Sequence, residues 1–182
     1  MVEANPDVRA VVDFWRQAGR ENWFTKNTAF DDEYRSRFNV LHEEAAAGRL
    51  AHWMATPEGA LGLLLLLDQF PRNCFRGTPR MYATDDLARL MARQALEGGL
   101  DLAAEEGLRV FFYLPFSHSE NIEDQTVAVE KNRPLVGDYL KHAVGHRDIV
   151  ERFGRFPHRN EILGRQTTAD EQRFLDEDGF KG

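Results

Sequence analysis

The sequence predicts an all-α protein that forms a single helical domain over residues 1–182, and three observations lead to this fold class. Apolar residues recur with helical spacing, as from Val8 through Val12 to Trp15, which places them on one helix face. Several of these stretches begin with a capping residue followed by proline, a typical helix start. A single stretch, Arg109–Leu114, has the composition of a strand, and a lone strand would have no partner. We therefore predict a buried helix there as well.

The expected helices follow one another with only short turns between them. The first helix begins at Asn5 and ends near Gly19, and the second covers the apolar stripe from Phe30 to Ala45 and ends at Gly48. Further helix starts are expected at Thr56-Pro57, at Thr78-Pro79 and at the capping box Thr168–Glu171. No repeat with a period of 20 to 50 residues is visible.

Composition excludes several classes of protein. The chain has 42% hydrophobic residues and a net charge of −7, which argues against disorder and against electrostatic attachment to nucleic acid. Its only cysteine, Cys74, rules out a disulfide scaffold and fits a reducing compartment. The longest apolar run, Leu61–Leu67, is far too short to span a membrane, and the first residues do not resemble a signal peptide. We expect a soluble cytoplasmic protein.

Polar residues follow directly on the most apolar stretch of the chain. The leucine run ends at Asp68 and Gln69, and Arg72 and Asn73 lie one helical turn further on. A buried carboxylate needs a partner, which Arg72 could supply at i+4 if the helix continues through Pro71. Two interpretations stay open: a structural ion pair that joins helix ends, or a carboxylate that lines a ligand pocket.

A second group of polar residues lies at the start of a later helix. His118 and Glu120 precede Asp124, and paired carboxylates beside an imidazole suit acid–base chemistry or metal binding. Acids in a first helical turn also simply complement the helix dipole. His142 and His146 have the spacing of a zinc-protease motif, but Ala143 stands where that motif needs glutamate.

The densest polar motif runs from Arg152 through Phe156 to Asn160 and on to Arg165. Five arginines between residues 147 and 165 face three acids, and arginine accounts for 19 of the 23 basic residues of the chain. Arginine pairs bidentately with carboxylates and phosphates. We expect these arginines to pair with Asp68, Glu120 and Asp124 across helices and to leave donors for an anionic small ligand or a peptide carboxylate.

Other nucleophilic or phosphate-binding motifs are weak. Gly59 and Gly62 lack the spacing and the lysine of a phosphate-binding loop. Cys74 lies near Arg72 and Arg76, whose charges would favour a thiolate, yet a lone cysteine at a helix end is more often inert packing.

These motifs together resemble the bacterial proteins grouped as domain of unknown function 924. The resemblance implies an all-helical fold similar to the tetratricopeptide-like superhelix, and it implies no activity. It rests on Phe14-Trp15, Trp23-Phe24, Leu66–Asn73, Leu114–Phe116, His118–Glu120, Asp124-Gln125, His146, Arg152–Asn160 and Leu163–Arg165.

We expect the polar side chains to meet on one concave face that binds a small anionic ligand or a peptide carboxylate. The expected ligand-binding residues are Asp68, Gln69, Arg72, Asn73, Asp124, His146, Arg152, Arg155, Arg159 and Asn160. One alternative is an enzyme in which His118, Glu120 and His158 carry out acid–base or metal-assisted chemistry. Another is an ion-pair cluster that serves stability alone. The pattern assigns no metal, cofactor or oligomeric state.

Overall fold

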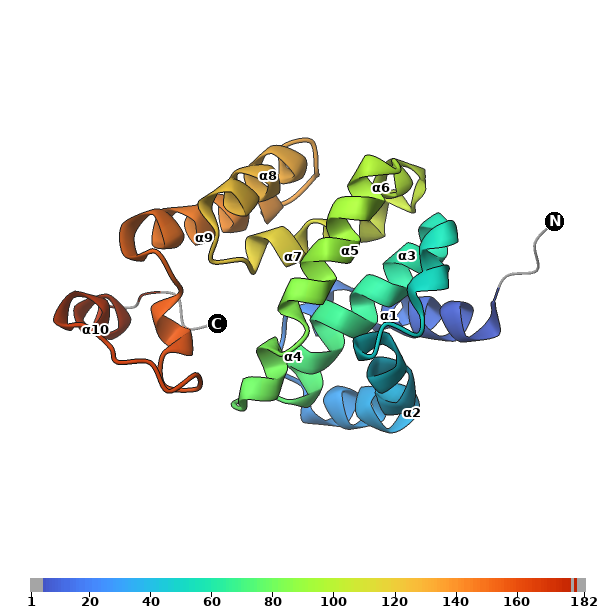
Figure 1. Cartoon of the computed structure of the whole chain (residues 1–182), viewed down its shortest axis with the longest axis horizontal. Helices are drawn as coiled ribbons and strands as arrows, with labels where there is room; N and C mark the ends of the chain where they lie inside the picture. The colour runs from blue at the N-terminus through green and yellow to red at the C-terminus, as the bar shows by residue number, and fades with distance from the viewer. Residues whose placement is uncertain (1–4, 178, 180–182) are drawn as a thin grey trace. The chain divides into compact units, whose positions relative to one another are not determined.

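The computed structural model describes residues 5–177 and 179, and all of their regular secondary structure is helical. The predicted fold class is therefore confirmed. The α-helices are α1 (Pro6–Trp23), α2 (Thr28–Ala46), α3 (Pro57–Leu64), α4 (Phe70–Cys74), α5 (Asp85–Glu97), α6 (Leu100–Ala103), α7 (Leu114–Ser117), α8 (Ile122–Asn132), α9 (Tyr139–Phe153) and α10 (Ala169–Asp176) (Figure 1). Between them lie turns of 3₁₀ or π-helix: η1 (Ala51–Ala55), η2 (Leu65–Gln69), η3 (Pro79–Tyr82), η4 (Glu106–Phe112) and η5 (Pro157–Arg159).

The chain divides into two compact units. The N-terminal unit comprises residues 1–76 and 80–115, and the C-terminal unit comprises residues 77–79 and 116–182. Each unit is described by itself below. The expectation of a single domain over residues 1–182 stays a prediction.

The core of the N-terminal unit is built from leucines and stacked aromatic rings. All five leucines of the run Leu63–Leu67 are at most 2% exposed. The rings of Trp15 and Tyr34 lie 5.4 Å apart, and that of Phe70 lies 5.1 Å from Tyr34. Helix α1 packs against α3, and α2 packs against α4. The leucine run is therefore surrounded by protein on all sides, as an all-apolar helix requires.

The leucine helix changes its winding just before the polar residues. After α3, the turn η2 is a π-helical turn in which the N–H of Phe70 donates to the carbonyl of Leu65. Such turns insert one extra residue into a helix. Helix α4 then begins with Pro71 in its first turn, where the missing proline N–H costs no hydrogen bond. The helical path continues through Pro71, which brings Asp68 and Arg72 within reach of each other.

Most of the expected helix starts are confirmed, and one is wrong. The side chains of Asn5, Thr56 and Thr168 cap α1, α3 and α10, and Thr168 forms the complete capping box with Glu171. By contrast, Thr78-Pro79 opens only the short turn η3, and the following α-helix begins at Asp85.

Two further details differ from the sequence interpretation. Gly19 does not end α1; it kinks the helix, with φ 67° and ψ 172°, and helical structure resumes to Trp23. The strand-like segment is helical and largely buried, as predicted, but residues 106–112 form the 3₁₀ turn η4 instead of an α-helix.

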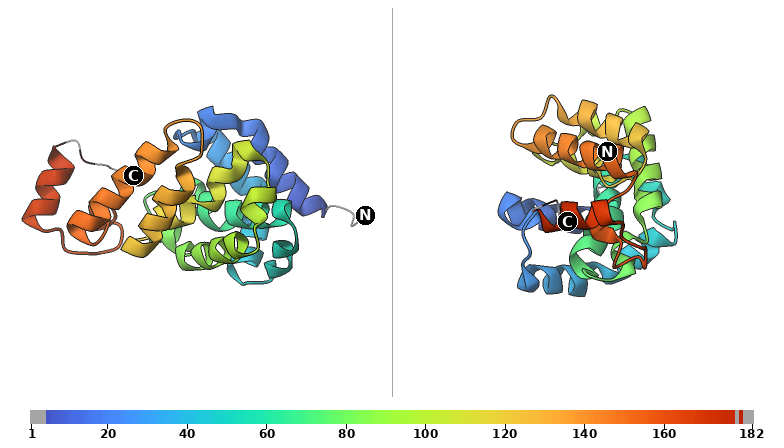
Figure 2. Two further views of the ribbon diagram at one scale, coloured as in Figure 1. Left: turned by 90° about the horizontal axis from the view of Figure 1, so that it is seen from above. Right: turned by 90° about the vertical axis from the view of Figure 1, so that its left-hand side faces the viewer.

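The C-terminal unit is built around a helix pair. Helices α8 and α9 pack side by side (Figures 1 and 2). Ile149, Val150 and Phe156 form a small apolar core, against which Phe153 and Phe174 pack. Helix α10 contacts the turn η5. No helix among the residues described in either unit combines the length and apolar character that a membrane span requires.

Candidate functional site

The polar residues predicted around Asp68 form an ion-pair network in the N-terminal unit. Arg72 Nη1 lies 3.1 Å from Asp68 Oδ1, and Gln69 Nε2 donates to Asp68 Oδ2 at 2.6 Å. The same guanidinium donates two hydrogen bonds to Asp85, of 2.7 and 2.9 Å. One arginine thus joins the end of the leucine helix to the start of α5. These contacts favour the structural interpretation of Asp68.

Asn73 belongs to a neighbouring network on α2. Its Nδ2 donates to Asp31 Oδ1 at 2.8 Å, and Arg76 Nε donates to Asp31 Oδ2 at 3.0 Å. The Asp31 side chain is only 8% exposed, so these donors satisfy a buried charge.

Cys74 lies beside this network, 2% exposed, and burial raises the pKa of its thiol to about 12. The structure therefore favours inert packing for Cys74.

In the C-terminal unit, Glu120 anchors the arginine-rich segment. Its carboxylate accepts two hydrogen bonds from Arg165, at 2.8 and 2.9 Å, and one from the N–H of Phe156 at 2.9 Å. Burial works against the charged form, but these hydrogen bonds and the nearby arginine charges outweigh it and lower the pKa of Glu120. The carboxylate stays ionised at neutral pH and holds Phe156 in place.

Arg155 pairs with Glu171, which the sequence analysis identified only as part of the capping box at Thr168–Glu171. Its guanidinium donates to Glu171 at 2.6 and 2.9 Å, and Asn160 Nδ2 lies 3.3 Å from the same carboxylate. Glu171 and Asn160 are both buried. Arg155 and Asn160 therefore tie the arginine-rich segment to α10.

Two imidazoles and one guanidinium lie against the Phe156 ring, and a third imidazole lies beside one of the two. We call His118, His146, His158 and Arg159 the histidine cluster. The rings of His146 and His158 each lie 5.6 Å from that of Phe156. The Arg159 guanidinium carbon is 4.6 Å from the same ring centre, and Arg159 Nη2 donates to the carbonyl of His118 at 2.8 Å. The His118 and His146 rings are 6.4 Å apart.

The environment of the histidine cluster disfavours additional positive charge. Burial lowers the pKa of His146 to about 3, and the charges of His118, His142, His158 and Arg159 act in the same direction. His146 is therefore neutral at pH 7. His142, one turn earlier on α9, is exposed and lies 3.1 Å from Asp138. Among the described residues, no three His, Cys, Asp or Glu side chains are arranged to hold a metal ion.

The remaining predicted residues have local roles in the structure. Asp124 Oδ2 accepts a hydrogen bond of 2.7 Å from Ser119 at the start of α8. Arg152 is 53% exposed and pairs with Asp170. The expectation that all predicted residues meet on one face stays a prediction, because Asp68, Gln69, Arg72 and Asn73 belong to the N-terminal unit and the others to the C-terminal unit.

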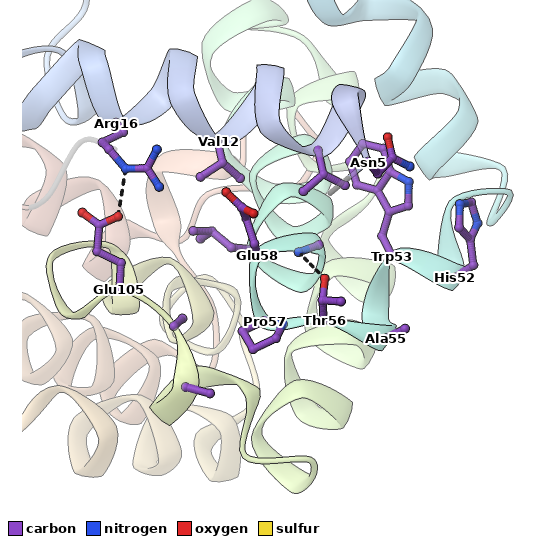
Figure 3. Close-up of a pocket in the computed structure, with 15 residues that line it drawn as sticks. Asn5, Val12, Arg16, His52, Trp53, Ala55, Thr56, Pro57, Glu58 and Glu105 are labelled. Carbon is purple, nitrogen blue, oxygen red and sulfur yellow. Dashed lines mark hydrogen bonds and ion pairs between the residues drawn. The ribbon is translucent and has the colours of Figure 1, made fainter. Parts of the chain in front are cut away.

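The N-terminal unit contains a pocket that the sequence interpretation missed. It has a volume of about 600 Å³ and is lined by α1, by the segment from η1 to α3 and by residues 103–105 (Figure 3). Arg16 and Glu105 face each other at one end, with 2.8 Å between Nε and Oε2. Trp53 and His52 lie at the other end. Glu58 stands between these ends.

The sequence carried a weak signal for this pocket. Gly59 and Gly62 failed as a phosphate-binding motif, but Gly59 is required for close packing against Trp53. A Cβ on Gly59 would lie 2.1 Å from the Trp53 carbonyl oxygen, whereas one on Gly62 would lie 3.4 Å from the Trp53 ring, about an ordinary contact distance. The glycine at position 59 thus indicated a close approach of two backbone segments.

Comparisons with known proteins place the fold but supply no activity. A family model described as "Bacterial protein of unknown function (DUF924)" matches residues 11–179. A protein of unknown function from Agrobacterium tumefaciens, whose structure is solved, is 56% identical to this chain. The match covers 93% of this chain and 97% of that one, with a TM-score of 0.92. No curated protein matches the sequence.

Proposed function

The chain belongs to the DUF924 family of bacterial proteins of unknown function, and we propose that it binds a small anionic ligand at the histidine cluster. The observation that supports this function is that His146, His158 and the Arg159 guanidinium lie against Phe156 and that the His118 ring lies beside His146. Inorganic anions and the carboxylates of small molecules or peptides share the required chemistry, since each accepts hydrogen bonds from guanidinium and imidazole groups.

The Arg159 guanidinium is the cationic group of the histidine cluster. Its charge acts on Glu120, which Arg165 also binds, while Glu171 is bound by Arg155. The Arg159 guanidinium carbon lies 4.6 Å from the centre of the Phe156 ring, and its charge would attract an anion beside that ring.

The depth of the cluster strengthens that attraction. His118, His146 and His158 are each partly exposed, whereas Arg159 is only 6% exposed. A charge–charge interaction in such a partly buried position is screened less than one on the open surface.

Calorimetric titration with sulfate tests this function. We expect saturable binding to the wild-type protein and binding at least about tenfold weaker in His158→Gln, because a hydrogen bond to a charged group contributes about 1.5–3 kcal/mol. His142→Gln is the matched control, since His142 is exposed and pairs with Asp138, and it should bind sulfate as the wild type does. Absence of saturable binding, or equal losses in both variants, would contradict the proposal.

The acid–base alternative receives less support from the contacts of Glu120. This carboxylate accepts its hydrogen bonds from Arg165 and from the N–H of Phe156, and its pKa is lowered. Neither donor is the imidazole of His118 or His158, the groups that Glu120 would assist in acid–base chemistry. Glu120 thus positions Phe156 and not an imidazole.

Two broader proposals accompany the binding function. We propose a cytoplasmic location, which the single buried thiol of Cys74 supports. We also propose a tetratricopeptide-like superhelix, which the packing of consecutive helices such as α8 and α9 supports. An experimental structure of the full chain tests the superhelix, and cell fractionation tests the location.

A further inference from the structure

The pocket beside α1 has mainly apolar walls. Val8, Val12 and Leu61 line it, and all three are buried residues of the N-terminal core. Trp53 adds an aromatic surface at one end. A volume of about 600 Å³ lies within the range of sites that hold small organic molecules. These walls would accept an apolar body of several carbon atoms.

The charged groups of this pocket give it the opposite sign from the histidine cluster. Arg16 pairs with Glu105 and also with Asp13 one turn earlier on α1. Glu58 acts on Arg16 through its charge, so one guanidinium faces three carboxylates. Burial of the guanidinium lowers the pKa of Arg16, but these acids outweigh it and the pKa is raised. The pocket keeps an excess of negative charge.

Glu58 is the carboxylate best placed to meet a ligand. It is half-buried, and its side chain extends from the first turn of α3 towards α1, between the Arg16–Glu105 pair and Trp53 (Figure 3). Arg16 is turned towards Glu105, with which it shares a hydrogen bond.

We propose that this pocket binds a small organic cation, namely a primary amine that carries an apolar chain or ring. The ammonium group binds Glu58, and the apolar body contacts the more exposed apolar lining residues Pro57, Ala103 and Ala104. This site is separate from the anion site proposed above, and it requires ligands of the opposite charge.

The walls of the pocket are rigid enough to keep this shape without a ligand. Thr56 caps α3 through a hydrogen bond from the N–H of Gly59, and Trp53 is held against Gly59 and Gly62. The Trp53 residue is 4% exposed. A preformed pocket loses less conformational entropy on binding than one that must be ordered by its ligand.

Calorimetric titration of the full chain with hexylamine, hexanol and hexanoate tests the proposal. At pH 7 these probes share one chain length and differ in charge. We expect hexylamine, as its ammonium ion, to bind most tightly and hexanoate to bind least. Glu58→Gln should weaken hexylamine binding about tenfold, the loss of one charge-assisted hydrogen bond, and should leave hexanol unchanged.

Two further variants locate the binding. Ala104→Phe places a ring in the pocket and should abolish binding of hexylamine and hexanol alike. Glu97→Gln is the matched control, an exposed acid at the end of α5 outside the pocket lining, and it should bind hexylamine as the wild type does. Equal affinity for the three probes, or hexylamine binding that survives both Glu58→Gln and Ala104→Phe, would overturn the proposal.

Discussion

The Glu171 carboxylate allows the stability of the C-terminal unit to be predicted as a function of pH. Its side chain is 3% exposed and accepts hydrogen bonds from Arg155 and from the N–H of Thr168. The bond from Arg155 is the main cause, and the Thr168 bonds a further one, of a pKa lowered from 4.5 to about 2. This difference between unfolded and folded chain corresponds to about 3 kcal/mol of stability at neutral pH.

We expect Glu171→Gln to remove that contribution while keeping the size of the side chain. Glutamine also supports a capping box, so the cap of α10 itself is preserved. Because the folded pKa is lowered, the contribution is complete above about pH 4.5 and is lost as the pH falls towards 2. The free energies of unfolding of wild type and variant should therefore differ by about 3 kcal/mol at pH 7 and converge in acid.

Hydrogen exchange of the α9 and α10 amides in urea measures the difference in the free energy of unfolding for the C-terminal unit, to which both helices belong. All three tryptophans lie in the N-terminal unit, so their fluorescence reports that unit separately. Asp170→Asn is the control, because Asp170 is 50% exposed, and it should cost less than about 0.5 kcal/mol. A Glu171→Gln loss no larger than the control, or one that stays constant on acidification, would refute the reasoning.

Three more predictions concern the N-terminal unit. Gly59→Ala forces a Cβ against the Trp53 carbonyl and should lower the free energy of unfolding by about 1–3 kcal/mol, as measured by urea titration. Gly107→Ala is the control: its Cβ meets nothing within 4 Å, so it should leave the free energy of unfolding nearly unchanged. Asp68→Asn removes one partner of a buried ion pair and should cost about 3 kcal/mol by the same assay; a loss below about 1 kcal/mol would disprove the structural role. Cys74 should resist iodoacetamide in the native protein at pH 8 and react with it in urea, because burial raises the pKa of its thiol to about 12. Rapid labelling of the native protein would contradict this prediction, since it would show an accessible thiolate.

Local features of the fold were predictable because their causes lie within one helical turn. The caps at Asn5, Thr56 and Thr168 each depend on a side chain and an N–H two or three residues later. The pair between Asp68 and Arg72 spans four residues and was predicted on condition that the helix continued through Pro71. The π-helical turn that permits this continuation has no distinct sequence signature.

Partners that are distant in sequence could not be assigned in the same way. Arg72 also binds Asp85, 13 residues away, and Asn73 binds Asp31, 42 residues away. Many acids were equally available at such separations. The arginine-rich segment was expected to pair with Asp68, Glu120 and Asp124. Arg165 does pair with Glu120, whereas Arg155 pairs with Glu171. The sequence alone could not select Glu171 as the partner of Arg155. A capping box already accounts for a glutamate at position 171, so nothing in the sequence indicated a second role for this residue.

The pocket was missed for a different physical reason. Val8 and Val12 were interpreted correctly as buried residues of a helix stripe, but burial in a core and contact with a cavity produce the same apolar pattern. Glu58 likewise has the expected place of an acid in a first helical turn. The cavity depends on how α1, α3 and residues 103–105 are spaced, which no single segment specifies.

The most direct test of anion binding at the histidine cluster is an NMR titration of the His146 imidazole between pH 7 and 3, with and without sulfate. We predict a pKa of about 3 for the protein alone. Bound sulfate should raise that pKa, because a neighbouring anion stabilises the imidazolium form. A pKa near 6.5 without sulfate would contradict the buried position of His146, and the same pKa in both titrations would contradict the proposed anion site.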